Sequence, residues 1–353
     1  MSAAPPEPRL LPSALRPAHG FPVARARFRV WPEDFRVVER LGFCPDGDGE
    51  HWLVRIRKRG CTTPDAVRVV ARAAGVAPRD VGYAGLKDRH AVTEQWLSVP
   101  VGGELMPGTV LGDVELLEVE RHRRKLRTGA LAGNRFVITL RDVSAAPERI
   151  SRRLLAIALD GVPNYFGPQR FGFQGRNLDK ALAYFEGRLR VRDRKLRGLL
   201  FSAARAELFN RVLSRRVAEG TWNRALPGEL MMLDGRRSLF AAETEPADSL
   251  VRRLTLMNIH PTGPLPGRGG ARPDADVAAL EAAVLEEAPA LMHGLVEHGL
   301  EGARRALRLH VSDLGWDFPA PGVVRVAMSL PAGAYATTVL GEVFELEREG
   351  LKD

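Results

Sequence analysis

One short segment of the chain carries residues that could do chemistry, GYAGLKDRHAVTEQW at positions 82–96. Gly82 and Gly85 favour a tight loop, because glycine adopts backbone angles that other residues avoid. Asp88 follows among cationic neighbours, which favour the ionised form of a carboxyl group. An ionised aspartate in a fixed loop can act as a nucleophile or a base. The alternative is a solvated turn with surface ion pairs, which is the commoner role of a lone aspartate.

The composition indicates a protein that binds polyanions. The chain has 353 residues and carries 52 Lys+Arg against 43 Asp+Glu, a net charge of +9. Such a length predicts about two domains, and such a charge favours nucleic acid as the partner. No apolar run approaches the roughly 20 residues of a membrane span, so no membrane association is expected. Two cysteines, Cys44 and Cys61, form neither a CxxC motif nor a disulfide framework, and we expect a cytoplasmic protein.

The elements around Asp88 can be predicted from the hydrophobic pattern. Residues 1–20 are proline-rich and are expected to form a flexible leader. Alternating apolar residues in ARARFRV, FRVVERLGF and HWLVRIRKRG predict three strands between positions 24 and 60. Residues 63–75 predict a helix with Thr63 as its cap, Pro64 in the first turn and Gly75 after the last. Further strands are expected at 96–101 and 114–119, so the order is strand, helix, Asp88 loop, strand.

A basic run follows these strands, before the apolar strand FVITL. Its position beside a glycine turn and a strand favours a fixed basic edge, which suits phosphate groups, over a solvated face. The expected phosphate contacts are Arg121, Arg123, Arg124, Lys125 and Arg127.

The second half of the chain changes from strands to helices after Ser151. Amphipathic helices are predicted in the segments DKALAYFEG and SAARAELFNRVLSRRVAEG. We expect residues 260–269 to form a turn-rich loop in which His260 is a loop or capping residue, residues 264–273 to be disordered, and residues 299–310 to form a helix. From position 311 the alternation returns and predicts a strand, a turn and a closing helix.

Five motifs, in order along the chain, resemble those of the TruD family of tRNA pseudouridine synthases. The resemblance covers nearly the whole chain from about Arg25, and the motifs read PEDFRVVE, GLKDRHAVTEQ, RHRRKLRTGALAGNRF, NYFGPQRFG and LPAGAYATTVLGE. The resemblance implies an α+β fold, with a catalytic domain built on a mixed, largely antiparallel sheet flanked by helices and a second α/β insertion domain. The implied domains are 21–160 and 310–353 for the catalytic part and 161–309 for the insertion.

The resemblance also implies the site and its chemistry. Asp88 takes the place of the catalytic aspartate, and Arg29 matches a basic position expected to face it. The expected substrate contacts are Phe35, Asn134, Phe136, Tyr335, Lys87 and Arg29. Many relatives have phenylalanine where this chain has Tyr335, and Phe35 would otherwise be taken for a core aromatic.

The implied activity is isomerisation of uridine, at position 13 of tRNA, to pseudouridine. The implied partner is tRNA, the protein is expected to be a monomer, and no metal, nucleotide or other cofactor is expected, because the reaction needs none. Two alternatives remain at this point. One is a non-catalytic RNA-binding module or RNA chaperone, and the other is a glycosidase-type hydrolase that pairs Asp88 with Glu33, Glu39 or Glu94.

Overall fold

The computed structural model describes residues 12–348, which form two compact units. The large-sheet unit comprises Pro22–Ala158, Val311–Ala336 and residues 343–348, and the helix-rich unit comprises residues 12–21, Leu159–His310 and Thr337–Glu342. Residues 1–11 of the expected leader lie outside the described residues. The rest of that segment is held by hydrogen bonds, because Ser13 donates to the Glu207 carboxylate and the amides of Ala18 and His19 donate to Glu342.

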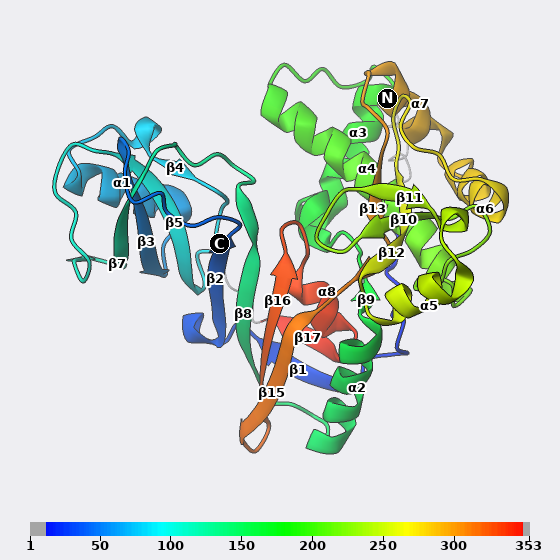
Figure 1. Cartoon of the computed structure of the whole chain (residues 1–353), viewed down its shortest axis with the longest axis horizontal. Coiled ribbons are helices and arrows are strands. Elements are labelled where there is room, and N and C mark those ends of the chain that lie inside the picture. The colour runs from blue at the N-terminus through cyan, green and yellow to red at the C-terminus, as the bar shows by residue number, and fades with distance from the viewer. Residues whose placement is uncertain (1–11, 349–353) are drawn as a thin grey trace, which may run out of the picture. The chain divides into compact units, whose positions relative to one another are not determined.

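The large-sheet unit contains a sheet whose main path runs β15-β16-β8-β2-β5-β3-β7-β6, with β1, β4 and β17 paired at its sides. Only β1 with β17 and β2 with β5 are parallel among the described strand pairs of this sheet. The expected α+β fold with a mixed, largely antiparallel sheet is therefore confirmed (Figure 1). The strands are β1 (Ala24–Phe28), β2 (Phe35–Leu41), β3 (His51–Arg59), β4 (Gly82–Tyr83), β5 (Val92–Pro100), β6 (Val110–Leu111), β7 (Val114–His122), β8 (Leu131–Arg141), β15 (Ser312–Ala320), β16 (Val323–Pro331) and β17 (Phe344–Arg348).

Helix α1 (Thr63–Ala73) covers one face of this sheet over β3 and β5. Its apolar residues Ala66, Val67 and Val70 pack with Ile56 and Leu97, and burial of such side chains is the main stabilising term in folding. The cap is Thr62 and not the predicted Thr63, because Thr62 and Asp65 form a reciprocal capping box. The hydroxyl of Thr63 is thereby available for another contact.

The helix-rich unit combines helices with a four-stranded antiparallel sheet of order β11-β10-β12-β13 and a two-stranded pair, β9 with β14. Its strands are β9 (Val162–Pro163), β10 (Leu230–Leu233), β11 (Leu239–Ala241), β12 (Ile259–Leu265), β13 (Ala303–Ala306) and β14 (Arg308–Leu309). The remaining α-helices of the chain are α2 (Pro147–Asp160), α3 (Arg176–Phe185), α4 (Arg194–Ala218), α5 (Ala247–Thr255), α6 (Ala275–Leu285), α7 (Pro289–Glu297) and α8 (Ala336–Gly341). Short 3-10 helices are η1 (Pro32–Asp34), η2 (Pro78–Asp80), η3 (Pro168–Phe171), η4 (Phe173–Gly175) and η5 (Ala242–Thr244).

Three predictions for this unit are wrong. Residues 259–265 form strand β12 and not a turn-rich loop, and residues 299–310 contribute β13 and β14 and not a helix. His260 is accordingly a buried strand residue. Residues 264–273, expected to be disordered, have a defined course that includes a β-bridge between Arg268 and Glu301.

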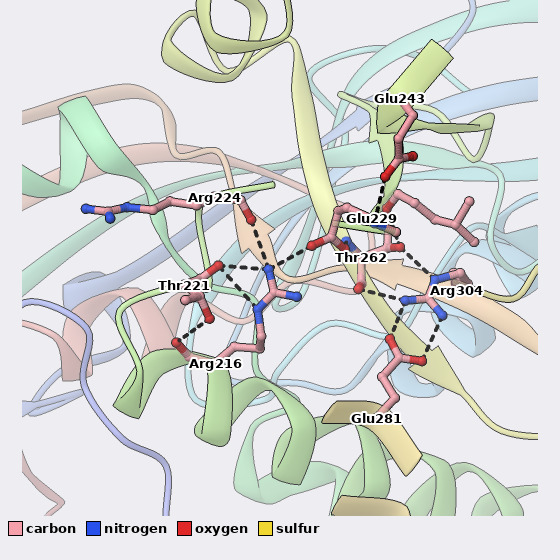
Figure 2. Close-up of polar contacts among 10 residues, drawn as sticks. Arg216, Thr221, Arg224, Glu229, Glu243, Thr262, Glu281 and Arg304 are labelled. Carbon is pink, nitrogen blue, oxygen red and sulfur yellow. Dashed lines mark hydrogen bonds and ion pairs between the residues drawn. The ribbon is translucent and has the colours of Figure 1, made fainter. Parts of the chain in front are cut away.

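Buried arginines explain why the strands of this unit were not recognised in the sequence (Figure 2). Arg304 in β13 donates to Glu281, to the Thr262 hydroxyl at 2.7 Å and to the Thr262 carbonyl at 2.8 Å. Arg216 in α4 donates to Glu229 at 2.8 Å, and all four charged side chains are buried. A sequence pattern scores arginine as solvent-facing, whereas here paired arginines occupy the interior.

Candidate active site

The loop that carries Asp88 is held by hydrogen bonds from its main chain. It connects β4 to β5, and the Lys87 amide donates to the hydroxyl of Thr63 at 2.9 Å. The carbonyl of Asp88 accepts from the Lys58 ammonium at 2.8 Å. At the start of the loop, the Gly129 amide donates to the carbonyl of Ala84 at 2.7 Å. The backbone is thus fixed on both sides of the aspartate, which leaves its side chain free to act.

Lys58 has no solvent exposure and also donates to the carbonyl of Cys61, at 2.6 Å. Burial lowers the pKa of the Lys58 ammonium, because desolvation disfavours the charged form. Two carbonyl acceptors satisfy the buried ammonium, and one of them belongs to the catalytic candidate itself. Lys58 is therefore a positioning residue for Asp88.

The carboxylate of Asp88 pairs with Arg29, as expected, at 2.9 Å. The Asp88 side chain is 53% exposed, whereas that of Arg29 is only 19% exposed. Arg29 follows β1 with a left-handed φ of 62°, and its guanidinium lies 4.0 Å from the centroid of Phe35. Cation–π contact and burial fix the arginine, so the arginine orients an aspartate that substrate can still reach.

Lys87 has a different place from the one expected. Its ammonium is almost fully buried and pairs with Glu39, whose other oxygen accepts the Trp96 amide at 3.1 Å. A lysine in this position holds the loop against β2, and its charge is compensated by Glu39. Arg89 points elsewhere, since its Nε donates to the carbonyl of Gly60.

The expected base-binding residues lie on the same face of the sheet as Lys58. Lys58 is paired with Thr93, Thr93 with Val37 and Val37 with Phe136 across β3, β5, β2 and β8. Directly paired residues share a face, and so do residues two apart on one strand. Phe35 and Asn134 therefore lie on this face too, as does Glu39, the partner of Asn134.

The two phenylalanines are more buried than a pair of open stacking platforms would be. Phe35 is 3% exposed and Phe136 is 8% exposed, with ring centroids 6.0 Å apart. Phe35 supports Arg29 through its ring face. Phe35 is thus a core aromatic residue that also contacts Arg29, the partner of Asp88.

Asn134 and Tyr335 lie toward the other end of these strands. Asn134 is paired with Leu330 of β16, and Tyr335 follows in the turn after that strand. The side-chain oxygen of Asn134 is buried and has no hydrogen-bond partner among residues 12–348. Because a buried acceptor without a partner is costly, this oxygen is a candidate for binding a substrate N–H group.

The basic run does not present all its charges to solvent. Arg123 makes two hydrogen bonds of 2.8 Å to Asp48, and Arg121 lies over the ring of Trp52 at 4.8 Å. Arg124 and Arg127 are exposed, and neither makes an ion pair with the described part of the chain. Arg123 is therefore a weaker candidate for a phosphate contact than its neighbours, since its charge is compensated.

Each carboxylate considered as a second hydrolytic group is committed to a cation. Glu33 pairs with Arg59 at 2.5 Å, Glu39 with Lys87, and Glu94 with Arg57 at 3.1 Å. The geometry thus offers Asp88 as the exposed acid of this loop and gives the hydrolase alternative no support.

Sequence reasoning missed two of the groups that hold the loop, Lys58 and Thr63. The signal for Lys58 was present, because it stands on the buried side of an alternating strand, where a lysine needs an internal partner. Thr63 was taken for a helix cap, a role that Thr62 fills.

Among residues 12–348, no three His, Cys, Asp or Glu side chains are grouped so as to hold a metal ion. None of the helices in this range has the length and apolar character needed to cross a membrane.

Known proteins resemble this chain along nearly all of its length. The profile of the family described as tRNA pseudouridine synthase D (TruD) matches residues 19–180 and 175–343. A tRNA pseudouridine synthase D from Methylococcus capsulatus is 48% identical over 339 residues, which are 95% of this chain and 96% of the relative. One from Nitrosococcus oceani is 49% identical over 91% of each chain. A crystal structure described as a tRNA pseudouridine synthase D from Methanosarcina mazei shares the fold, with a TM-score of 0.70, 22% identity and 95% coverage of both chains.

Proposed function

Because this chain belongs to the tRNA pseudouridine synthase D family, we propose that it converts uridine in tRNA, at position 13, to pseudouridine. The observation that carries the proposal is the state of Asp88. Its carboxylate is half-exposed and oriented by Arg29, and its main chain is held by Lys58. An RNA-binding module would gain nothing from an acid in this position, because the acid repels phosphate.

The reaction breaks the bond between ribose C1′ and uracil N1 and forms a bond between C1′ and uracil C5. The C5 proton is lost and N1 gains a proton, so atoms balance without a redox partner. Asp88 starts the reaction either as a nucleophile at C1′ or as a base that removes a ribose proton. In both cases the target nucleotide must leave its stack, at a cost of a few kcal/mol.

The detached base must stay in the site while it turns. We assign this task to the face of the sheet that carries Phe136 and Asn134, together with Tyr335. The unpartnered oxygen of Asn134 would accept a hydrogen bond from uracil N3–H. Phe35 acts indirectly, through the guanidinium of Arg29 that lies on its ring.

The proposed division of labour follows the domains expected from the sequence. The large-sheet unit acts as the catalytic domain expected at 21–160 and from 310 onward, and the helix-rich unit, which also takes in Thr337–Glu342, acts as the insertion expected at 161–309 and contributes to tRNA binding. We also propose that the protein works as a cytoplasmic monomer. Light scattering of the purified protein with and without tRNA tests the monomer, and a dimer in both samples would contradict it.

A single assay separates the three functional alternatives. The purified protein is incubated with an unmodified tRNA transcript that carries tritium at uracil C5, and three products are measured. Tritium release with pseudouridine at position 13 is the expected result. Free uracil would indicate the hydrolase, and tRNA binding without either product would indicate the RNA-binding module.

A further inference from the structure

We propose that a basic pocket beside the catalytic loop binds a second nucleotide of the RNA, adjacent in sequence to the target uridine. The inference rests on the proposed function, because it takes tRNA as the ligand. The pocket is a cavity of about 630 Å³ in the large-sheet unit, between α1, η2, β4 and residues 125–128. Neither Asp88 nor its partners Arg29 and Lys58 line it, so it is distinct from the site that holds the target.

The pocket walls are positively charged. Arg68, Arg79, Lys125 and Arg127 line the cavity, and its lining includes no acidic residue. Arg68 is compensated by Asp65, whereas the other three make no ion pair with the described residues. The Lys125 ammonium donates to the carbonyl of Arg79 at 2.9 Å. Three uncompensated cations around one cavity favour a phosphate ligand.

The remaining lining suits a base. Tyr83, Pro64 and Pro78 contribute flat or apolar surface, and Tyr83 is half-buried. Aromatic side chains beside cations are a general means of binding unstacked bases without regard to sequence. A cavity of this size lies within the usual range for small-molecule sites, and the combination of charge and flat surface fits one nucleotide.

The basic segment that lines the pocket, residues 125–128, is held in place by contacts with the rest of the unit. The amide of Leu126 donates to the hydroxyl of Ser98 at 2.8 Å, and the Leu126 side chain is buried. At Gly82, a Cβ atom would lie only 2.5 Å from the carbonyl of Leu126, so β4 and this segment touch through their backbones. Because the pocket is preformed, binding there requires little ordering of the protein.

Each wall of the pocket is connected to the catalytic loop. Tyr83 ends the strand that leads into the loop, and Pro64 follows Thr63, which accepts the Lys87 amide. The segment after Arg127 is tied to the loop by the Gly129 amide, which donates to Ala84. A ligand in the pocket therefore lies next to the loop without reaching Asp88, which is the place of a neighbouring nucleotide.

The test compares two double variants that remove the same charge. R79Q/R127Q alters the pocket, and R135Q/R149Q alters two exposed arginines of the same unit that do not line it. Affinity is measured for an unmodified tRNA transcript and for transcripts with one abasic ribose on the 5′ or the 3′ side of the target. Pseudouridine formation at saturating RNA and thermal unfolding are measured in parallel.

We expect R79Q/R127Q to weaken tRNA binding about tenfold more than R135Q/R149Q does, since two phosphate contacts are lost. One of the two abasic transcripts should bind the wild type more weakly than intact tRNA does. R79Q/R127Q should bind that transcript and intact tRNA equally, because without the two phosphate contacts the neighbouring nucleotide no longer occupies the pocket. Equal losses in the two variants, or an abasic effect that R79Q/R127Q leaves unchanged, would overturn the inference. A wild type that neither binds tRNA nor forms pseudouridine would instead refute the proposed function.

Discussion

The reactive aspartate depends on side chains that lie outside its own loop. Lys58 and Thr63 hold the main chain around Asp88, and Arg29 orients the carboxylate. Because Asp88 is half-exposed, its ion pair with Arg29 contributes little to stability. The value of the pair is geometric, since an arginine packed on Phe35 presents its N–H groups in a fixed direction.

Replacing this arginine tests the geometric role. Arg29→Gln should lower kcat about a hundredfold, because small misplacement of a reacting group has effects of this size. The dissociation constant for tRNA should change by less than about threefold, as expected for loss of one partly exposed charge. Single-turnover pseudouridine formation and filter binding measure the two quantities.

Arg36→Gln is the matched control, because Arg36 is exposed on the neighbouring strand and its side chain faces away from the site. It should leave kcat unchanged. If Arg29→Gln were as active as this control, Arg29 would have no part in positioning Asp88.

The pairing of Arg29 with Asp88 could be predicted because both residues stand in recognisable motifs, and the structure shows this pair. The sequence did not reveal that Lys87 pairs with the buried Glu39. Which of several adjacent cations faces inward depends on the path of the loop, and that path is set by Lys58 and Thr63. Such contacts between residues far apart in the sequence leave no periodic pattern of hydrophobic residues.

At the scale of elements, strand β12 illustrates how buried polar groups change a fold assignment. His260 lies in β12 and donates through Nε2 to Asp234 at 2.9 Å, while Arg308 of β14 donates to its Nδ1 at 3.1 Å. His310 also contacts Asp234, at 3.2 Å. A histidine, two arginines and prolines looked like a loop and a helix in the sequence, although their partners form a sheet.

The same cluster predicts a pH effect on stability. Burial lowers the pKa of His260 below its ordinary value of 6.5, and the Arg308 donor keeps Nδ1 unprotonated. As pH falls through 6.5, the unfolded chain takes up a proton at this histidine that the folded chain does not. The free energy of unfolding should therefore decrease with acidification.

Urea unfolding followed by circular dichroism at several pH values between 7.5 and 5.5 measures this dependence. His260→Gln should reduce the loss of stability over the range, whereas His293→Gln, at a side chain that is 74% exposed, should not. Identical slopes for the wild type and His260→Gln would contradict the linkage.

For the whole molecule, the sequence predicted the class of the fold because the motifs follow one another in order along the chain. The two compact units are each assembled from separate segments, which alternation and composition do not reveal. The excess of cations over acids, +9 overall, was visible from the start. The sequence did not show which of these cations lack an acidic partner. In the structure Arg123 pairs with Asp48, whereas Arg124 and Arg127 stay exposed.

The uncompensated charges predict that tRNA binding weakens steeply with salt. Each phosphate contact contributes about 0.7 to 0.9 to the slope of log affinity against log salt. A slope of several units is expected for the wild type, and a smaller slope for R79Q/R127Q. Binding that stays constant from low to moderate salt would show that electrostatic contacts to phosphate are not what holds the RNA.

The most direct measurement concerns the aspartate itself. Asp88→Asn keeps the shape of the side chain and removes its charge, and Asp113→Asn makes the same change at an exposed residue of the same unit. With tritiated tRNA, Asp88→Asn should release no tritium and form no pseudouridine, while its tRNA affinity stays within about threefold of that of the wild type. Asp113→Asn should be fully active. Retained pseudouridine formation by Asp88→Asn would contradict the assignment of Asp88 as the catalytic residue.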